Sequence, residues 1–234
     1  MKQKPIPDAL LPFLEGRLLF IDKPYGWTSF DIVKKVRYLT KVMKVGHAGT
    51  LDPLATGLLI IGTGRYTKSM DAYRGMQKEY TGTMVLGATT PTYDLESEPE
   101  NFKSIEGLTN EIIQKARLPF IGEIFQIPPS HSAIKKEGRR LYESARLGIE
   151  VKADPRKVII ESFEITKIEL PHIHFKVICS TGTYIRSLVK DFGESLKVGA
   201  YMSSLRRTRI GEFTVDKAQL WQDLETQVKA LLEG

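Results

Sequence analysis

Hydrophobic and polar positions along this chain follow two periods, which predict a mixture of helices and strands. Between Thr28 and Thr40 the apolar residues Ile32, Val33, Val36 and Leu39 recur with helical spacing, and Thr28 or Ser29 can cap the helix they form. Further helices are predicted near residues 110–117, 138–147, 183–196 and 217–232. Apolar or β-branched runs bounded by turn residues predict strands at 17–22, 58–62, 78–86, 123–127, 157–169, 173–180 and 207–213.

These elements are interspersed without a regular alternation of strand and helix, and several strand pairs are placed to form hairpins. We therefore expect an α+β fold with a mixed, mostly antiparallel sheet flanked by helices, rather than a doubly wound parallel sheet. The length of 234 residues allows one large domain or two small ones. The acidic stretch Asp94–Glu106 is predicted to be a solvated loop.

Charge is distributed unevenly along the chain, whose formal net charge is +6. Residues 31–47 carry five lysines and arginines against one acid, and residues 134–157 carry eight against four. Residues 92–111 and 212–234 are acidic on balance. This segregation favours basic surfaces for a polyanion such as nucleic acid.

Several classes of protein find no support in the sequence. The single cysteine, Cys179, excludes an intrachain disulfide, and no uncharged segment approaches the length of a membrane span. The motifs of P-loop nucleotide hydrolases, HExxH zinc enzymes and CxxC redox proteins do not occur. His172 and His174 lie near Cys179 but lack the further ligands of a metal site. We expect a cytoplasmic protein without a metal.

A glycine-rich loop around Asp52, GHAGTLDPLATG at residues 46–57, is the first candidate site. Its glycines supply backbone freedom, while Pro53 biases Asp52 toward an extended conformation. Asp-Pro is often only turn chemistry, but a constrained carboxylate in such a loop is also typical of a site that acts on a substrate.

Other polar segments allow two interpretations each. Thr183 is a plausible cap for a helix whose first turn holds Arg186, which either pairs with a carboxylate or lies on a solvated face. Tyr80 is either a core aromatic or a platform for a base. The arginines in residues 205–209 and the basic residues that follow Gln126–Pro129 could each form a solvated face, but both together on a basic chain favour phosphate contacts.

Taken together, these segments resemble the TruB family of tRNA pseudouridine synthases. The resemblance rests on blocks that occur in family order: DKPYGWTS at 22–29, GHAGTLDPLATG at 46–57, KEY at 78–80 with LG at 86–87, QIPP at 126–129 with SAIK at 132–135, GTYIRSL at 182–188, and LRR at 205–207 with Gly211 and Phe213.

The resemblance implies a pseudouridine synthase fold and isomerisation of the T-loop uridine of tRNA, conventionally numbered 55, without cofactor or metal. Asp52 would act on the ribose, either as a nucleophile at C1′ or by promoting an elimination, and Arg186 would keep that carboxylate ionised. The target base would be flipped out of the RNA and stacked on Tyr80, which is placed to help remove the C5 proton. The remaining family positions are those of His47, which would fill the vacated space, Lys23 near the site, and Tyr184 and Leu205 in the pocket.

Two departures from the family pattern affect these expectations. His131 stands where a tyrosine is expected, and residues 216–234 leave room for a short helix but no complete PUA-type RNA-binding domain. We therefore expect a catalytic domain over residues 1–215 that binds the tRNA T-arm and elbow as a monomer. Two alternatives stay open: a protein whose main task is to refold tRNA, and a synthase that acts on ribosomal RNA with a guide RNA.

Overall fold

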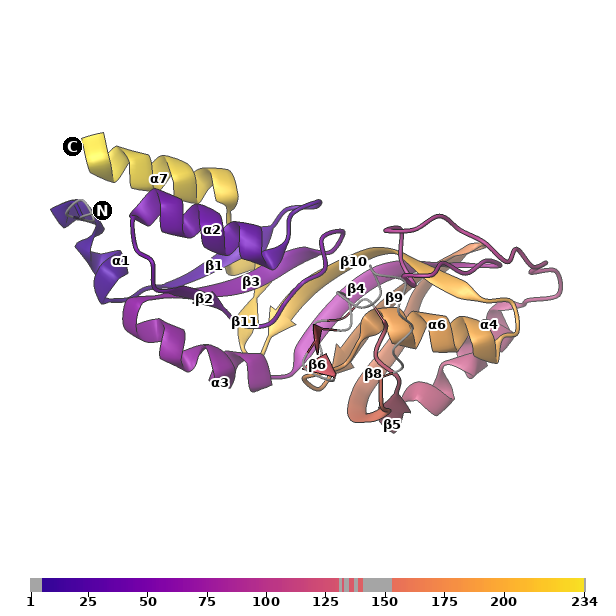
Figure 1. The fold of residues 1–234 in the computed structure, drawn as a ribbon. Coiled ribbons are helices and arrows are strands. Elements are labelled where there is room, and N and C mark those ends of the chain that lie inside the picture. The colour runs from indigo at the N-terminus through magenta and orange to yellow at the C-terminus, as the bar shows by residue number, and fades with distance from the viewer. Residues whose placement is uncertain (1–5, 131, 133–134, 137–138, 141–152, 234) are drawn as a thin grey trace. The chain divides into compact units, whose positions relative to one another are not determined.

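The computed structural model describes residues 6–130, 132, 135–136, 139–140 and 153–233, and the chain divides into two compact units (Figure 1). The first unit consists of residues 1–78 and 206–234, and the second of residues 79–205.

In the first unit, four strands form a sheet in the order β12-β1-β3-β10. These are β12 (Gln219–Leu220), β1 (Leu18–Lys23), β3 (Thr56–Thr63) and β10 (Ala200–Ile210), of which the part from Arg206 onward belongs to this unit. Strands β1 and β3 are antiparallel, with Ile21 opposite Leu59, while β3 and β10 are parallel, with Gly57 opposite Arg207. Strand β2 (Val45–His47) pairs with β3, and β11 (Phe213–Thr214) pairs with β10.

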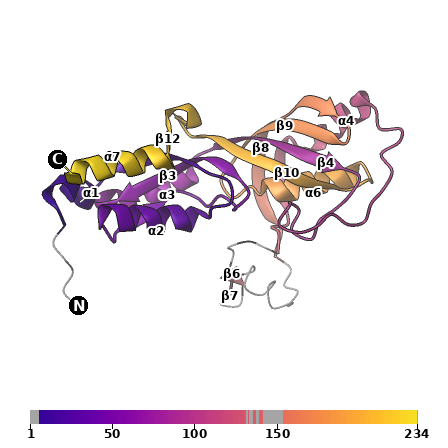
Figure 2. The same ribbon diagram turned by 90° about the horizontal axis from the view of Figure 1, so that it is seen from above.

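Alternate residues of β1 and β3 enter two apolar layers. Helices α1 (Leu11–Glu15), α2 (Ser29–Thr40) and α7 (Trp221–Glu233) pack on the layer that contains Ile21 and Ile61, with α2 and α7 side by side (Figures 1 and 2). Helix α3 (Met70–Gly75) packs on the opposite layer, which contains Leu58 and Ile60. Short 3₁₀ turns complete the unit: η1 (Asp8–Leu10), η2 (Gly64–Ser69) and η4 (Val215–Lys217).

In the second unit, the strand order is β10-β4-β9-β8-β5. Strand β4 (Lys78–Leu86) leads into this unit, which also contains β5 (Gly122–Gln126), β8 (Arg156–Glu169), β9 (His172–Cys179), α4 (Asn110–Ala116), η3 (Leu118–Phe120) and α6 (Ile185–Ser195). Helix α6 packs through Phe192, whose ring centroid lies 5.6 Å from that of Phe163 on β8. A two-stranded pair of β6 (Lys135–Lys136) and β7 (Arg139–Arg140) lies in the segment after β5.

The α+β class and the mixed sheet are confirmed. Helix α2 begins as predicted, because Thr28 and Asp31 form a reciprocal capping box, and its four predicted apolar residues are buried. The predicted strand at 207–213 was too short. Strand β10 runs from Ala200 to Ile210. The two serines between the buried Met202 and Leu205 interrupt the alternation of buried and polar positions, which obscured the first half of the strand.

Other boundaries also differ from the predictions. The helix predicted at 183–196 begins at Ile185, and Tyr184 rather than Thr183 occupies its N-cap position. The basic helix predicted at 138–147 is wrong at Arg139–Arg140, which form strand β7, and its remainder lies outside the described residues, as does His131. Helices α1 and α3 and strands β2 and β12 were not predicted.

Candidate active site

In the first unit, the loop that carries Asp52 connects β2 to β3 and is tied to the start of α2. The Ser29 hydroxyl accepts a hydrogen bond from the Leu51 amide at 2.8 Å and donates one to the Leu51 carbonyl at 3.2 Å. The Ala55 amide donates to the Asp52 carbonyl at 3.1 Å, which closes a turn over Pro53. The backbone on both sides of the half-buried Asp52 is therefore held in place.

Lys23 lies fully buried beneath this loop. Its Nζ donates to the carbonyls of Trp27 at 2.6 Å, Pro24 at 2.9 Å and Pro53 at 3.2 Å. Burial lowers the pKa of Lys23 to about 8, and the nearby Asp52 opposes that shift. With three carbonyl partners for its three donors, Lys23 supports the residue next to Asp52 rather than presenting its ammonium group to solvent.

We expect Lys23→Met to change the pH dependence of stability. The pKa is lower in the folded protein than in the unfolded chain, so between about pH 8 and the ordinary lysine pKa of 10.5 the unfolded chain binds more protons. The free energy of unfolding of the wild type should therefore rise relative to Lys23→Met across that window, by up to about 1.4 kcal/mol per pH unit. Urea denaturation of both proteins from pH 7 to 10.5 measures the difference. A difference in the free energy of unfolding between the two proteins that stays constant across this pH range would contradict the prediction.

Arg207 is the second fully buried cation at the loop. Its guanidinium donates to the Leu58 carbonyl at 2.8 Å, the Gly49 carbonyl at 3.2 Å and the Thr50 carbonyl at 3.5 Å. These carbonyls lie on both sides of Asp52, so Arg207 clamps the two ends of the loop. The expectation that Arg207 contacts phosphate is wrong, because its guanidinium is enclosed.

Two neighbours of Arg207 explain more of the sequence pattern. Gly57 has φ +103°, and a Cβ there would lie 2.3 Å from the Arg207 carbonyl oxygen, so the close pairing of β3 with β10 requires glycine. Arg206 forms a bidentate pair with Asp22, at 3.0 and 2.6 Å. This arginine therefore braces β1 rather than presenting an unpaired cation to RNA.

His47 lies on β2, half-buried and opposite Ile61 of β3. Burial lowers its pKa, and the positive charges of Arg74 and Arg207 act in the same direction. The Arg74 guanidinium also donates to the His47 carbonyl at 3.4 Å. With a pKa below its ordinary value of 6.5, the imidazole is mostly neutral at pH 7.

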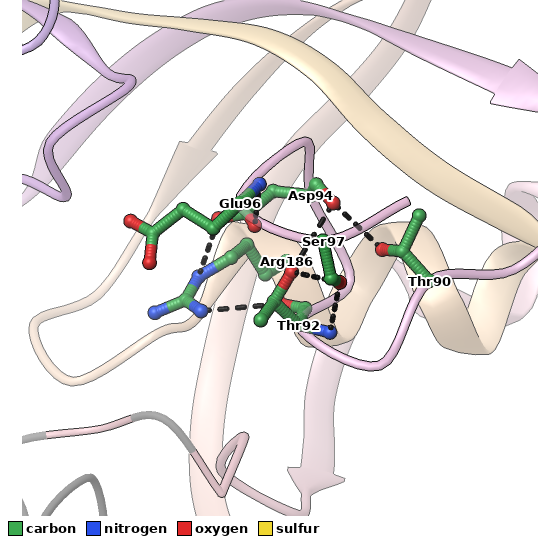
Figure 3. Close-up of polar contacts among 6 residues, drawn as sticks. All are labelled: Thr90, Thr92, Asp94, Glu96, Ser97 and Arg186. Carbon is green, nitrogen blue, oxygen red and sulfur yellow. Dashed lines mark hydrogen bonds and ion pairs between the residues drawn. The ribbon is translucent and has the colours of Figure 1, made fainter. Parts of the chain in front are cut away.

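In the second unit, Arg186 lies on the first turn of α6 with only 4% of its surface exposed. Its Nε is 3.6 Å from Oδ2 of Asp94, which is 2% exposed, and its Nη1 donates to the Thr92 carbonyl at 3.2 Å (Figure 3). The interpretation of Arg186 as a solvated residue is wrong. The carboxylate seen beside it within this unit is that of Asp94.

The loop from Thr90 to Ser97 fixes the orientation of Asp94 (Figure 3). The Thr90 and Thr92 hydroxyls both donate to the Asp94 carbonyl, at 2.7 and 3.2 Å, and the Glu96 amide donates to Asp94 Oδ1 at 3.0 Å. The Ser97 hydroxyl contacts that of Thr92 at 2.7 Å. The prediction that the acidic stretch is solvated throughout is therefore wrong at its first residue.

The remaining candidates in the second unit lie on three elements. Tyr80 on β4 is 8% exposed and Leu205 on β10 is 7% exposed. The backbone of Tyr184 is held by the side chain of Gln126, which accepts from the Tyr184 amide at 3.0 Å and donates to its carbonyl at 3.3 Å. The end of β5 thus positions the start of α6.

Lys23, His47 and Asp52 belong to the first unit, where Lys23 lies near Asp52, and Tyr80, Tyr184, Arg186 and Leu205 belong to the second. Sequence reasoning gave no role to Asp94, and it named Gln126 and Arg207 without predicting that they hold backbone groups at these positions. A signal for Asp94 was present in the threonines of TTPTYD at 89–94, which are typical of side-chain-capped turns. For the buried Arg207 we find no local signal.

Within residues 6–130, 132, 135–136, 139–140 and 153–233, no helix has both the length and the apolar character needed to cross a membrane. Among the same residues, no three histidine, cysteine, aspartate or glutamate side chains cluster so as to hold a metal ion.

Comparison with solved structures defines the class of protein. One chain from a crystal structure of a Cbf5-Nop10-Gar1 complex superimposes with a TM-score of 0.73 and 29% sequence identity, covering 94% of this chain and 56% of that chain. A second, from an H/ACA RNP bound to a substrate RNA that contains 2′-deoxyuridine, gives a TM-score of 0.72 at 27% identity, over 97% of this chain and 57% of that one. The fold is that of the pseudouridine synthases.

Sequence comparison is more specific. Residues 37–185 match the model of the TruB family pseudouridylate synthase N-terminal domain, and residues 186–233 match that of the tRNA pseudouridylate synthase B C-terminal domain. The chain is 51% identical to tRNA pseudouridine synthase B of Flavobacterium johnsoniae, over 88% of this chain and 93% of that protein. It is 45% identical to the Parabacteroides distasonis protein of the same name, over 92% and 94%. The chain belongs to the TruB family of pseudouridylate synthases.

Proposed function

We propose that the protein converts uridine 55 in the T-loop of tRNA to pseudouridine, with Asp52 as the residue that acts on the ribose. The observation that carries the proposal is the setting of Asp52. Two fully buried cations, Lys23 and Arg207, hydrogen-bond to carbonyls on either side of one carboxylate, which remains half-buried. Such a rigid loop meets the requirement that a catalytic group be held in place before the substrate arrives.

The chemistry needs no added atoms. The N1–C1′ bond of the uridine breaks, the uracil turns, and a C5–C1′ bond forms; the proton at C5 is lost and N1 gains one. Asp52 either attacks C1′ to form a covalent intermediate or removes the C2′ proton to start an elimination. A second carboxylate acting directly on the sugar, as in most glycosidases, is not required.

The other predicted residues take supporting roles in this proposal. Flipping brings the target base out of the T-loop, Tyr80 stacks on it, and the neutral His47 fills the space it leaves. Tyr184 and Leu205 line the pocket of the flipped base. Arg186, buried and held by Asp94 and the Thr92 carbonyl, supplies a fixed positive charge that favours the ionised form of the catalytic carboxylate. We also propose that the protein works as a monomer on the T-arm.

The test is tritium release from tRNA transcripts labelled at uracil C5. We expect release from wild-type protein, none from Asp52→Ala, and none at the target position when uridine 55 is replaced by cytidine. A T-arm stem-loop should react at a rate near that of whole tRNA, and ribosomal RNA fragments should not react. Release that persists in Asp52→Ala would refute the role of Asp52, and release that persists with cytidine 55 would refute the target.

A further inference from the structure

The outward face of α2 combines exposed aromatic rings with exposed lysines. Tyr38 is 78% exposed and Phe30 is 49% exposed, while the Lys34 side chain is 61% exposed. We call the lysines of this face and the rings beneath them the α2 cationic face; its members are Trp27, Phe30, Lys34, Lys35, Tyr38 and Lys41.

Each lysine of the α2 cationic face lies over an aromatic ring. The distance from Nζ to the ring centroid is 4.4 Å for Lys41 over Tyr38 and 5.0 Å for Lys34 over Phe30. Lys35 lies over Trp27 at 4.4 Å. Such contacts hold a long side chain extended without neutralising its charge. The ammonium groups are therefore partly ordered before any ligand arrives.

Few acids oppose these charges. Asp31 lies 3.9 Å from Lys34, but its carboxylate already accepts from the Thr28 amide and hydroxyl in the capping box. From the neighbouring helix α7, Glu225 faces Lys35 and is itself paired with Lys229 at 2.8 Å. The α2 cationic face therefore keeps an excess of positive charge.

Helix α2 is also fixed to the segment that carries His47 and Asp52. Its first residue, Ser29, is doubly hydrogen-bonded to Leu51, next to Asp52. Near its other end, Arg37 Nη2 donates to the Val45 carbonyl at 3.1 Å, two residues before His47. A ligand on the outer face of α2 would thus be bound at a fixed position relative to Asp52.

We propose that the α2 cationic face binds the phosphate backbone of the substrate tRNA outside the flipped nucleotide. This inference rests on the proposed function for the identity of the RNA. A shallow hollow of about 380 Å³, lined by Trp27, Asp31, Lys34 and Lys35, lies on this face. A membrane is disfavoured as the partner, because a lysine ammonium lies over each of the three rings, so the face presents charge and does not form a continuous apolar surface.

The test compares two double variants with equal loss of charge. Lys34→Gln with Lys41→Gln alters the α2 cationic face. Lys115→Gln with Lys167→Gln is the matched control, since those side chains are 71% and 63% exposed on the other unit. Binding of tRNA is measured from 50 to 300 mM salt. If two phosphate contacts are lost, the slope of log K against log salt should fall by about 1.8, and affinity near 0.1 M salt by at least about tenfold. The control should match the wild type.

A third variant separates charge from packing. Tyr38→Leu removes the ring beneath Lys41 and keeps the charge, so it should weaken binding less than the double variant and leave the salt slope unchanged. We call the double variant Lys34→Gln with Lys41→Gln the α2 variant. Equal slopes of log K against log salt for the α2 variant and its control would overturn the inference. So would unchanged tRNA binding together with a selective loss of binding to phosphatidylserine vesicles.

Turnover distinguishes failure of this inference from failure of the proposed function. Saturating tRNA should restore the rate of the α2 variant, with KM raised and kcat unchanged. If the wild type released no tritium while the α2 variant still lost tRNA affinity, the proposed function would fail and the α2 cationic face would stand as an RNA-binding surface. If the wild type were active and the α2 variant matched the control in KM and slope, only this inference would fail.

Discussion

Asp52→Asn should lower the rate of pseudouridine formation by at least about 10⁴-fold, because the amide can neither attack C1′ nor accept a proton from C2′. The substitution preserves the shape of the side chain and leaves the backbone bonds at Leu51, Pro53 and Ala55 in place. We expect the midpoint of thermal unfolding to fall only slightly, by the loss of the favourable charge of Asp52 beside buried Lys23. The pKa of Lys23 should fall further, since Asp52 raises it in the wild type. Single-turnover tritium release measures the loss of rate.

The matched control is Asp8→Asn, an exposed aspartate in the same unit. It should retain wild-type activity. Asp52→Asn should still bind tRNA and still promote refolding of the T-arm, which would separate the isomerase from the tRNA-refolding activity that the sequence left open. A rate for Asp52→Asn within tenfold of the wild type would refute the assignment of Asp52.

The second large effect is expected at Asp94. Asp94→Asn removes the buried charge beside Arg186, leaving a guanidinium that is 4% exposed without that carboxylate. Breaking a buried pair on one side costs about 3–5 kcal/mol, so we expect the free energy of unfolding to fall by about 3 kcal/mol. On the proposed mechanism kcat should also fall by about 10²-fold, because a displaced Arg186 would no longer favour the ionised form of Asp52. Urea denaturation and saturating tritium-release kinetics measure the two effects.

Glu98→Gln supplies the control, because it removes an exposed carboxylate from the same loop. It should leave the free energy of unfolding and kcat unchanged. Combining Asp94→Asn with Arg186→Lys should cost less in kcat than the sum of the single losses, with a coupling energy of at least about 1 kcal/mol. Additive losses would show that the two residues act independently, and an unchanged kcat in a destabilised Asp94→Asn would limit Asp94 to a structural role.

The local elements were within reach of sequence reasoning because their signals are local. Ile32, Val33, Val36 and Leu39 recur within about two turns of the helix, and Thr28 and Asp31 complete the cap three residues apart. Strand β4 begins and ends where predicted. The loop around Asp52 could also be picked out from its glycines. Gly57 has a positive φ that only glycine adopts without strain, so its presence in the sequence indicates a special backbone conformation.

Only the tertiary structure decided which charged residues lie inside. Arg207 reaches the Gly49 carbonyl across 158 positions of sequence, and Arg186 reaches the Thr92 carbonyl across 94. Charged side chains are rarely buried without partners, so composition alone places them on the surface, and that expectation failed for Lys23, Asp94 and Arg207. Periodicity within a segment indicates which side of that segment faces the core. It does not indicate which backbone carbonyls will need a buried donor, because that depends on how segments distant in sequence meet in the folded protein.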